Sequence, residues 1–192
     1  MDFLYETKHL YIRTLIDDDA GILLDYCKRN AGFFSEYETE YPENYFTEEY
    51  QRMLIKGYMQ QFLKSTGVRY YLFEKDNDER IVGTVGLSRI ICGEERSAVL
   101  SYKLDRDFCG KGYATEACAE LLNRAAIGFR LHRIEADILP GNVKSVAVAE
   151  RLGFKHEGTS RLSHRVGSAW ADHERYSLII GVDELPPAYS RS

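Results

Sequence analysis

The chain has 192 residues, a length typical of a single domain with one hydrophobic core. Hydrophobic residues make up 44% of it and charged residues 29%, and 25 basic against 30 acidic side chains give a net charge of −5, which argues against a nucleic-acid-binding surface. No apolar run is long enough to cross a membrane, and the first residues lack the basic and apolar segments of a secretion signal. The four cysteines include no C-x-x-C pair, so we expect reduced thiols, a cytoplasmic location and no bound metal.

The first half of the chain alternates between strand and helix patterns. Up to residue 104 it predicts a strand over 9–15, a helix from the aspartates at 17–19 through Cys27, an irregular acidic and aromatic segment over 31–47, a helix from Thr47 to about Lys64, and strands over 68–75, 80–90 and 98–104. The aspartates supply the N-cap and first-turn acids of the first helix. The last three strands follow one another through short turns, which indicates an antiparallel meander.

The second half of the chain predicts parallel units. They are a helix over 112–129, a strand over 133–139, a helix over 143–152, and strands over 154–165 and 172–180. We therefore expect an α+β fold with a mixed sheet of about seven strands, in which the meander precedes a β-α-β-α-β unit. Residues 1–192 are expected to form one domain, with a flexible tail over 185–192. A dinucleotide-binding fold would place its parallel units first and repeat them, so this order argues against a dehydrogenase.

A glycine-rich turn links the strand ending at Leu104 to the helix that follows it. Gly110 and Gly112 let the backbone approach a ligand without a Cβ in the way. The first N–H groups of the helix have no intrahelical partner and the helix dipole favours negative charge, so the turn is suited to phosphate. The run lacks the G-K-[ST] ending of a Walker loop, and Thr115 stands where a dinucleotide fingerprint has glycine or alanine. A tight turn without a ligand is the alternative interpretation.

A series of short motifs runs in order through residues 98–180. They are Tyr102-Lys103-Leu104, the run from Gly110 to Ala117, Asn142 with Ser145, Gly153-Phe154, Glu157-Gly158, and Gly167 with Trp170, Asp172 and Tyr176. In this order and spacing the chain resembles the GNAT N-acetyltransferases, and within them the Rim-type branch that acetylates the N-termini of ribosomal proteins. Cys109 departs from the family's usual Gln or Arg, and residues 1–97 match only in pattern.

The resemblance implies acetyl-CoA as the acetyl donor, with its diphosphate on the glycine turn and its pantetheine arm where two parallel strands separate. Those strands would be the one ending at Leu104 and the one over 133–139. The residues that the resemblance implies in cofactor binding are Tyr102, Lys103, Leu104, Cys109, Gly110, Lys111, Gly112, Tyr113, Ala114, Thr115, Asn142 and Ser145. A solvated surface lysine is an equal interpretation of Lys111.

Two side chains are candidates for proton transfer as an amine attacks the thioester directly. The family's tyrosine acid is replaced by Ala149, so the resemblance points to Ser145 as the proton donor, against a purely structural serine at a helix start. Asn142 caps the same helix, with or without a contact to the cofactor. His164 stands where Rim enzymes carry a glutamate and is the candidate base, with a packing or surface histidine as the alternative.

The acidic and aromatic segment over 31–47 falls where the fold places its acceptor-side loop. Its carboxylates would attract a cationic amine and its rings would shield the reacting nitrogen, against the alternative of a solvated loop. The implied acceptor-binding residues are Glu36, Tyr37, Glu38 and Tyr41. The expected acceptor is the amine of a protein N-terminus or of a small molecule such as a polyamine or aminoglycoside, with no nucleic-acid or membrane partner and a monomeric or homodimeric protein. A non-catalytic acyl-CoA sensor is the third interpretation.

Overall fold

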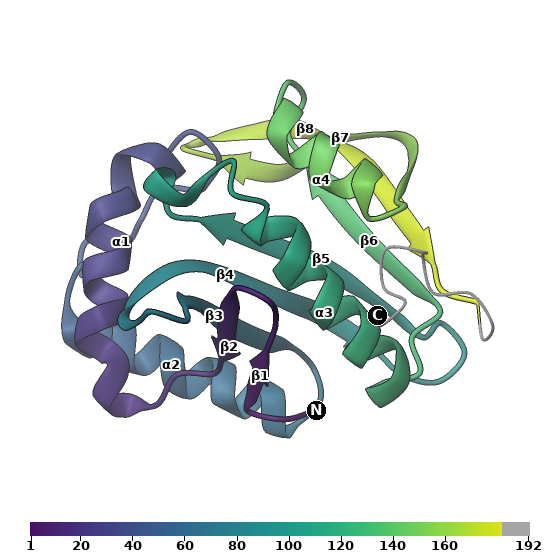
Figure 1. Ribbon diagram of the computed structural model, residues 1–192. Helices are drawn as coiled ribbons and strands as arrows, with labels where there is room; N and C mark the ends of the chain where they lie inside the picture. The colour runs from purple at the N-terminus through teal and green to yellow at the C-terminus, as the bar shows by residue number, and fades with distance from the viewer. Residues whose placement is uncertain (182–192) are drawn as a thin grey trace.

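The computed structural model describes residues 1–181 (Figure 1), so the tail predicted over 185–192 lies outside the described residues. The elements in chain order are β1 (Leu4–Glu6), β2 (Leu10–Arg13), a 3₁₀ turn η1 (Asp17–Asp19), α1 (Ala20–Phe34), α2 (Glu48–Leu63), β3 (Val68–Glu74), β4 (Asn77–Ile91), β5 (Ser97–Leu104), a 3₁₀ turn η2 (Arg106–Phe108), α3 (Tyr113–Gly128), β6 (Arg133–Ile138), α4 (Val143–Arg151), β7 (Lys155–Val166) and β8 (Ala169–Ile179). The strands form one sheet in the order β1-β2-β3-β4-β5-β6-β8-β7. None of the helices in residues 1–181 is both long and apolar enough to span a membrane.

The predicted α+β class and the order of its elements are confirmed. The sheet has an eighth strand, β1, which is only three residues long and therefore too short to show a periodicity. The helix α1 continues to Phe34, into the segment predicted to be irregular. The prediction that the aspartates cap α1 with a side chain is wrong, because the Asp19 carboxylate accepts hydrogen bonds from Arg13 and from the N–H of Ile16 instead. The predicted start of α2 is confirmed, and Thr47 Oγ1 caps the helix by accepting from the N–H of Tyr50.

Helices cover both faces of the sheet because its central strands are apolar on both sides. Along β3, Tyr70 and Leu72 pack into a core with α3 and α4, whereas Tyr71 and Phe73 pack into a second core with α1 and α2. In Figure 1, α3 and α4 lie in front of the sheet, and α2 lies behind it. Strands with two buried faces are typical of the centre of such a layered fold.

The two parallel strands at the centre of the sheet separate part-way along their length. β5 and β6 are paired only from Ser97–Arg133 to Val99–Glu135. Beyond that point β5 still pairs with β4 up to Leu104, and β6 still pairs with β8 up to Ile138. Among residues 1–181, the facing edges of β5 and β6 therefore have unpaired backbone groups next to each other, at the end where α3 begins (Figure 1).

A buried carboxylate fixes the segment that leads from β5 into the glycine turn. Asp105 is 2% exposed, and its side chain accepts hydrogen bonds from Arg29 of α1, from Arg80 of β4 and from the N–H of Asp107. Burial by itself would raise the pKa of Asp105, but the Asp107 N–H and the two guanidinium groups hold it below its usual value. The cluster ties α1 and β4 to the start of the turn.

We expect Asp105→Asn to lower the free energy of unfolding by about 2 kcal/mol at pH 7, because two arginines lose their charged partner. The native pKa of Asp105 is depressed, so its contribution is complete above the pKa of about 4 of an unfolded aspartate and is lost as the pH falls through the native value. Urea unfolding at pH 7 and pH 3 measures this, and the difference between the two proteins should shrink at pH 3. Asp107→Asn, at a carboxylate that is 70% exposed, is the control and should change stability by no more than about 0.5 kcal/mol.

Candidate functional site

The glycine turn opens α3 with backbone conformations that glycine adopts without strain. Gly110 and Gly112 have φ values of +84° and +85°, and Gly112 is the N-cap residue of α3 in the left-handed conformation. A Cβ built at either position would meet no atom of residues 1–181 within 4 Å, so the space beside the turn is open. The first intrahelical bond runs from the N–H of Glu116 to the carbonyl of Gly112. The N–H groups of Tyr113, Ala114 and Thr115 therefore lack intrahelical acceptors and are available to an anion.

The polar side chains around this turn bind one another. Lys111 Nζ lies 3.1 Å from Glu74 Oε1 and 4.4 Å from the centre of the Phe108 ring, so its charge is partly neutralised by β3. Glu116 accepts hydrogen bonds from Thr7 Oγ1 and from the backbone and ring of His9, which fixes α3 to the loop between β1 and β2. Glu116 therefore has a structural function.

A guanidinium group from α4 lies beside the first turn of α3. Arg151 Nη1 donates to Thr115 Oγ1 over 3.0 Å. It adds positive charge at the end of the helix where the dipole is also positive. No local sequence pattern points to Arg151, because the contact joins two helices that are separated by β6.

Tyr102 connects β5 to the start of α4 across the region where β5 and β6 separate. Its hydroxyl donates to the carbonyl of Ser145 over 3.1 Å. Burial raises the pKa of Tyr102 well above the usual value, so the phenol stays protonated at neutral pH. On the same helix, Asn142 Oδ1 accepts from the N–H of Ser145 over 3.1 Å, which confirms the predicted N-cap. The structure thus brings together three residues predicted separately.

The predicted acceptor-side loop closes over the other face of β5. The carboxylate of Glu38 forms an ion pair with Lys103 Nζ and accepts a hydrogen bond of 2.6 Å from the hydroxyl of Tyr41. The carbonyl of Glu38 accepts from the N–H of Gly167, at the tip of the β7–β8 hairpin, over 2.7 Å. Burial lowers the pKa of Lys103 to about 8, although the electrostatic effect of Cys27 partly opposes that shift. Glu36 and Tyr37 are exposed.

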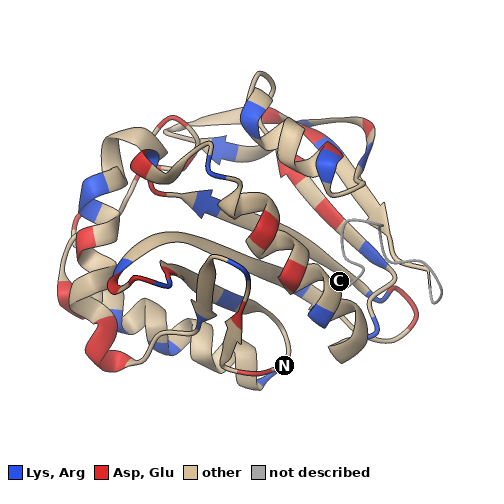
Figure 2. Cartoon of the chain, viewed as in Figure 1, with Lys and Arg blue, Asp and Glu red and all other residues tan. Residues whose placement is uncertain are grey.

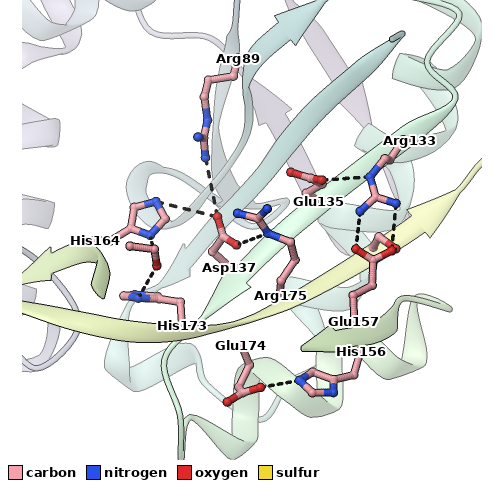
Figure 3. Close-up of polar contacts among 12 residues, drawn as sticks. Arg89, Arg133, Glu135, Asp137, His156, Glu157, His164, His173, Glu174 and Arg175 are labelled. Atoms are coloured by element: carbon pink, nitrogen blue, oxygen red, sulfur yellow. Dashed lines mark hydrogen bonds and ion pairs between the residues drawn. The ribbon is translucent and has the colours of Figure 1, made fainter. Parts of the chain in front are cut away.

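His164 lies beside a carboxylate that the sequence did not single out. Asp137 of β6 has a side chain only 6% exposed, and its Oδ2 is 3.8 Å from His164 Nε2. Figure 3 shows His164, Arg89 and Arg175 pointing toward Asp137 from three different strands. Burial lowers the pKa of His164, and the charge of Asp137 partly reverses that shift. In β6, Asp137 alternates with the apolar residues Ala136 and Ile138, a pattern typical of a solvent-facing side chain. The neighbouring strands bury it instead.

A hollow of about 360 Å³ lies at the opposite end of β5 and β6, where the two strands are still paired. Arg89, Val99, Arg133 and Glu135 contribute to its wall. In the view of Figure 2, blue and red residues are interspersed along β6, β7 and β8. The hollow is therefore bounded by both signs of charge and is distinct from the region where the strands separate.

Comparison with known proteins gives concordant matches. The profile of the acetyltransferase (GNAT) domain family matches residues 9–155. The chain is 34% identical over 177 residues to the probable N-acetyltransferase YjcK of Bacillus subtilis, covering 92% of this chain and 97% of that protein. It is 30% identical over 169 residues to the [ribosomal protein uS5]-alanine N-acetyltransferase of Escherichia coli, covering 87% of this chain and 86% of that protein.

A solved structure has the same fold. Mycobacterium smegmatis RimJ, determined in complex with CoA-disulfide, superimposes with a TM-score of 0.87 at 23% sequence identity. The match covers 96% of this chain and 90% of RimJ. The overall fold of sheet and helices is therefore shared with that protein.

Proposed function

The chain belongs to the GNAT acetyltransferase family, and from that premise we propose that it transfers an acetyl group from acetyl-CoA to the α-amino group of a protein N-terminus. The observation that carries the proposal is the coincidence of two features at one end of the sheet. The open glycine turn with its unpartnered N–H groups lies where β5 and β6 separate. The first feature suits a diphosphate and the second suits an extended, amide-bearing arm.

The residues of this chain fit coenzyme A without requiring a special side chain. The N–H groups from Gly110 to Thr115 would hold the diphosphate, and Arg151 would add a charge-assisted hydrogen bond. Because backbone groups do this, Cys109 in place of the usual Gln or Arg changes little. The unpaired edge of β5 from Tyr102 to Leu104 would bind the pantetheine amides. When bound, acetyl-CoA supplies an acetyl group activated as a thioester.

The acceptor amine arrives on the face of β5 where Lys103 pairs with Glu38 of the segment between α1 and α2. It must lose a proton before it attacks, and we assign that proton to His164, whose lowered pKa keeps the imidazole neutral at physiological pH. The thiolate that leaves must gain a proton, and we assign its donor as the hydroxyl of Ser145 at the start of α4. Tyr102 holds that start in place through the Ser145 carbonyl.

Replacing Ser145 with alanine should separate the capping of α4 from the donation of a proton to the thiolate. The cap uses the Ser145 backbone N–H, so Ser145→Ala retains it and should leave the melting temperature and the CoA dissociation constant unchanged. We expect kcat to fall about 100-fold, because a positioned proton donor is lost. Tyr102→Phe retains Ser145 and serves as the comparison, with a smaller loss expected. Stopped-flow detection of thiol release measures both variants, and full activity in Ser145→Ala would remove Ser145 from the mechanism.

The acceptor is assigned from the 30% identical Escherichia coli enzyme, whose name gives an alanine of ribosomal protein uS5 as its target. Acceptors of that kind occur in the cytoplasm, where we place the reaction, and the whole chain would act as one domain. The exposed carboxylate of Glu36 favours a second candidate, a polyamine or aminoglycoside.

A panel of acceptors distinguishes these candidates. Thiol release from acetyl-CoA is followed with peptides that begin with alanine or serine, with the same peptides blocked at the N-terminus, and with spermidine and an aminoglycoside. We expect release only with the free N-termini, and mass spectrometry should place the acetyl group on the α-amino nitrogen. Faster release with spermidine than with every peptide would overturn the protein acceptor and support the small-molecule one.

A further inference from the structure

We infer that Asp137 is a positioning residue for His164, holding its proton on Nε2 and stabilising the imidazolium that forms when the ring accepts a proton at Nδ1. The inference rests on the proposed function, in which His164 takes the proton of the acceptor amine. In that step an N–H bond of the ammonium group breaks and its proton passes to Ser163 Oγ, while the proton that Ser163 gives up forms the N–H bond at His164 Nδ1. The positive charge moves from the acceptor to the ring, next to the carboxylate.

The position of Asp137 suits this task. It stands two residues beyond Glu135, the last residue of β6 that pairs with β5, so it lies at the start of the region where the strands separate. Its Oδ1 is 3.2 Å from Arg175 Nε, whereas its Oδ2 is buried and has no hydrogen-bond partner among the described residues. A buried carboxylate oxygen without a hydrogen bond is costly. Arg89 Nη2 at 3.7 Å and His164 Nε2 at 3.8 Å lie just beyond hydrogen-bond distance of this oxygen, so a small movement of the ring would let His164 donate to it.

A bulge in β7 brings His164 to this carboxylate. The pairing of β7 with β8 shifts between Ser160 and His164, and Leu162 in the shifted segment has a φ of +47°. The N–H of Leu162 donates to Asp172 Oδ1 over 2.8 Å, which fixes the bulge. Regular pairing would alternate Ser163 and His164 between the two faces of the sheet, and the bulge instead lets both side chains meet.

A chain of hydrogen bonds assigns the tautomer of His164. His173 Nδ1 is 3.2 Å from the carbonyl of Ala171, which only accepts, so His173 carries a proton on Nδ1. Ser163 Oγ lies 3.4 Å from the same His173 nitrogen and 3.1 Å from His164 Nδ1. A hydroxyl that accepts from His173 keeps its own proton free, and we assign that proton to the hydrogen bond with His164 Nδ1. Neutral His164 must then carry its proton on Nε2, the nitrogen that faces Asp137 (Figure 3).

Asp137 shifts the pKa of His164 in the direction opposite to the other groups around the ring. Burial, His173, Arg89 and Arg175 all lower the pKa of His164, and Asp137 is the one group that raises it among those found to shift it. Arg89 and Arg175 also pair with the carboxylate of Asp137 itself, at 3.7 and 3.2 Å. Loss of the Asp137 charge should therefore move the pKa of His164 further down, because only the opposing groups remain.

The test is Asp137→Asn, followed by activity and by NMR of the histidine ring. With an alanine-initiated peptide as acceptor, we expect kcat/KM to fall at least tenfold at pH 7.5, because an amide NH₂ facing Nε2 favours the wrong tautomer. The acidic limb of the pH profile should move to lower pH, and the His164 ring should titrate at lower pH with or without acceptor. If Asp137 were purely structural, its replacement would lower activity without moving the acidic limb or the pH at which His164 titrates.

Glu135→Gln is the matched control, since Glu135 is the preceding carboxylate on the same face of β6 and also pairs with an arginine. Glu135→Gln should leave the acidic limb and the pH at which His164 titrates unchanged. The ¹⁵N shifts of wild-type His164 provide a second test that needs no variant, and a proton on Nδ1 of the neutral ring would overturn the inference. So would an unchanged titration in Asp137→Asn. If wild-type protein acetylates no amine, the proposed function fails, while the ring titration still tests whether Asp137 controls His164.

Discussion

Gly112→Ala is expected to weaken CoA binding at least tenfold, equivalent to about 1.4 kcal/mol, and to lower the free energy of unfolding by about 1 kcal/mol. Gly112 has a φ of +85°, where a Cβ strains the backbone, and its Cβ would project into the open side of the turn. The two effects thus have separate causes. The strain acts on folding, and the methyl group acts on the space that the diphosphate needs. Urea unfolding measures the first and isothermal titration with CoA measures the second.

The control for this experiment is a glycine with the same conformation and no ligand. Gly93, in the turn between β4 and β5, has a φ of +93° and equally open surroundings. Gly93→Ala should lose a similar amount of stability and keep the wild-type affinity for CoA. Equal weakening of CoA binding in both variants would show that the glycine turn is not the diphosphate site.

His164→Ala is expected to lower kcat/KM about 100-fold at pH 7, the effect typical of removing a positioned base. In the wild-type protein, activity should fall as the pH drops through the pKa of His164, which burial holds below the usual value of about 6.5. In the variant that limb should vanish, and activity should instead rise steadily with pH as more of the acceptor becomes free amine. Rates of thiol release between pH 5 and 9 measure both profiles.

A second histidine on the same strand provides the control. His156 also lies in β7 and also pairs with a carboxylate, that of Glu174, but it is exposed and lies away from the Asp137 cluster (Figure 3). His156→Gln should keep both the rate and the acidic limb of wild-type protein. A His164→Ala profile that keeps the wild-type limb would mean that another group accepts the proton.

Local sequence rules were sufficient for the features that depend on neighbouring residues. The pair Gly110 and Gly112 predicted the open turn, and the positive φ values of both residues confirm it. Asn142 predicted a helix cap and Thr47 predicted the start of a helix, and both form as expected. Alternation predicted the ends of β6 and of the meander strands to within three residues. In each case the determining interaction spans fewer than about five residues, so the sequence window contains it.

Local sequence rules could not predict contacts between residues that lie far apart in the chain. β1 is too short for a pattern and exists because it pairs with β2. The resemblance implies Tyr102 in cofactor binding, and it does not predict that the Tyr102 hydroxyl donates to the start of α4. The ion pair of Glu38 with Lys103 joins a loop to a strand far along the chain. These contacts depend on how the elements pack, which no short segment encodes.

The sequence by itself determined the order of the elements, the open glycine turn and the family, because glycine conformation, caps and apolar periodicity are local properties. Only the tertiary structure decided that Asp137 is buried and faces His164. That arrangement requires the register of β6 against β8 and the bulge at Leu162 to act together, and a shift of one residue in either strand would turn a side chain to the opposite face of the sheet.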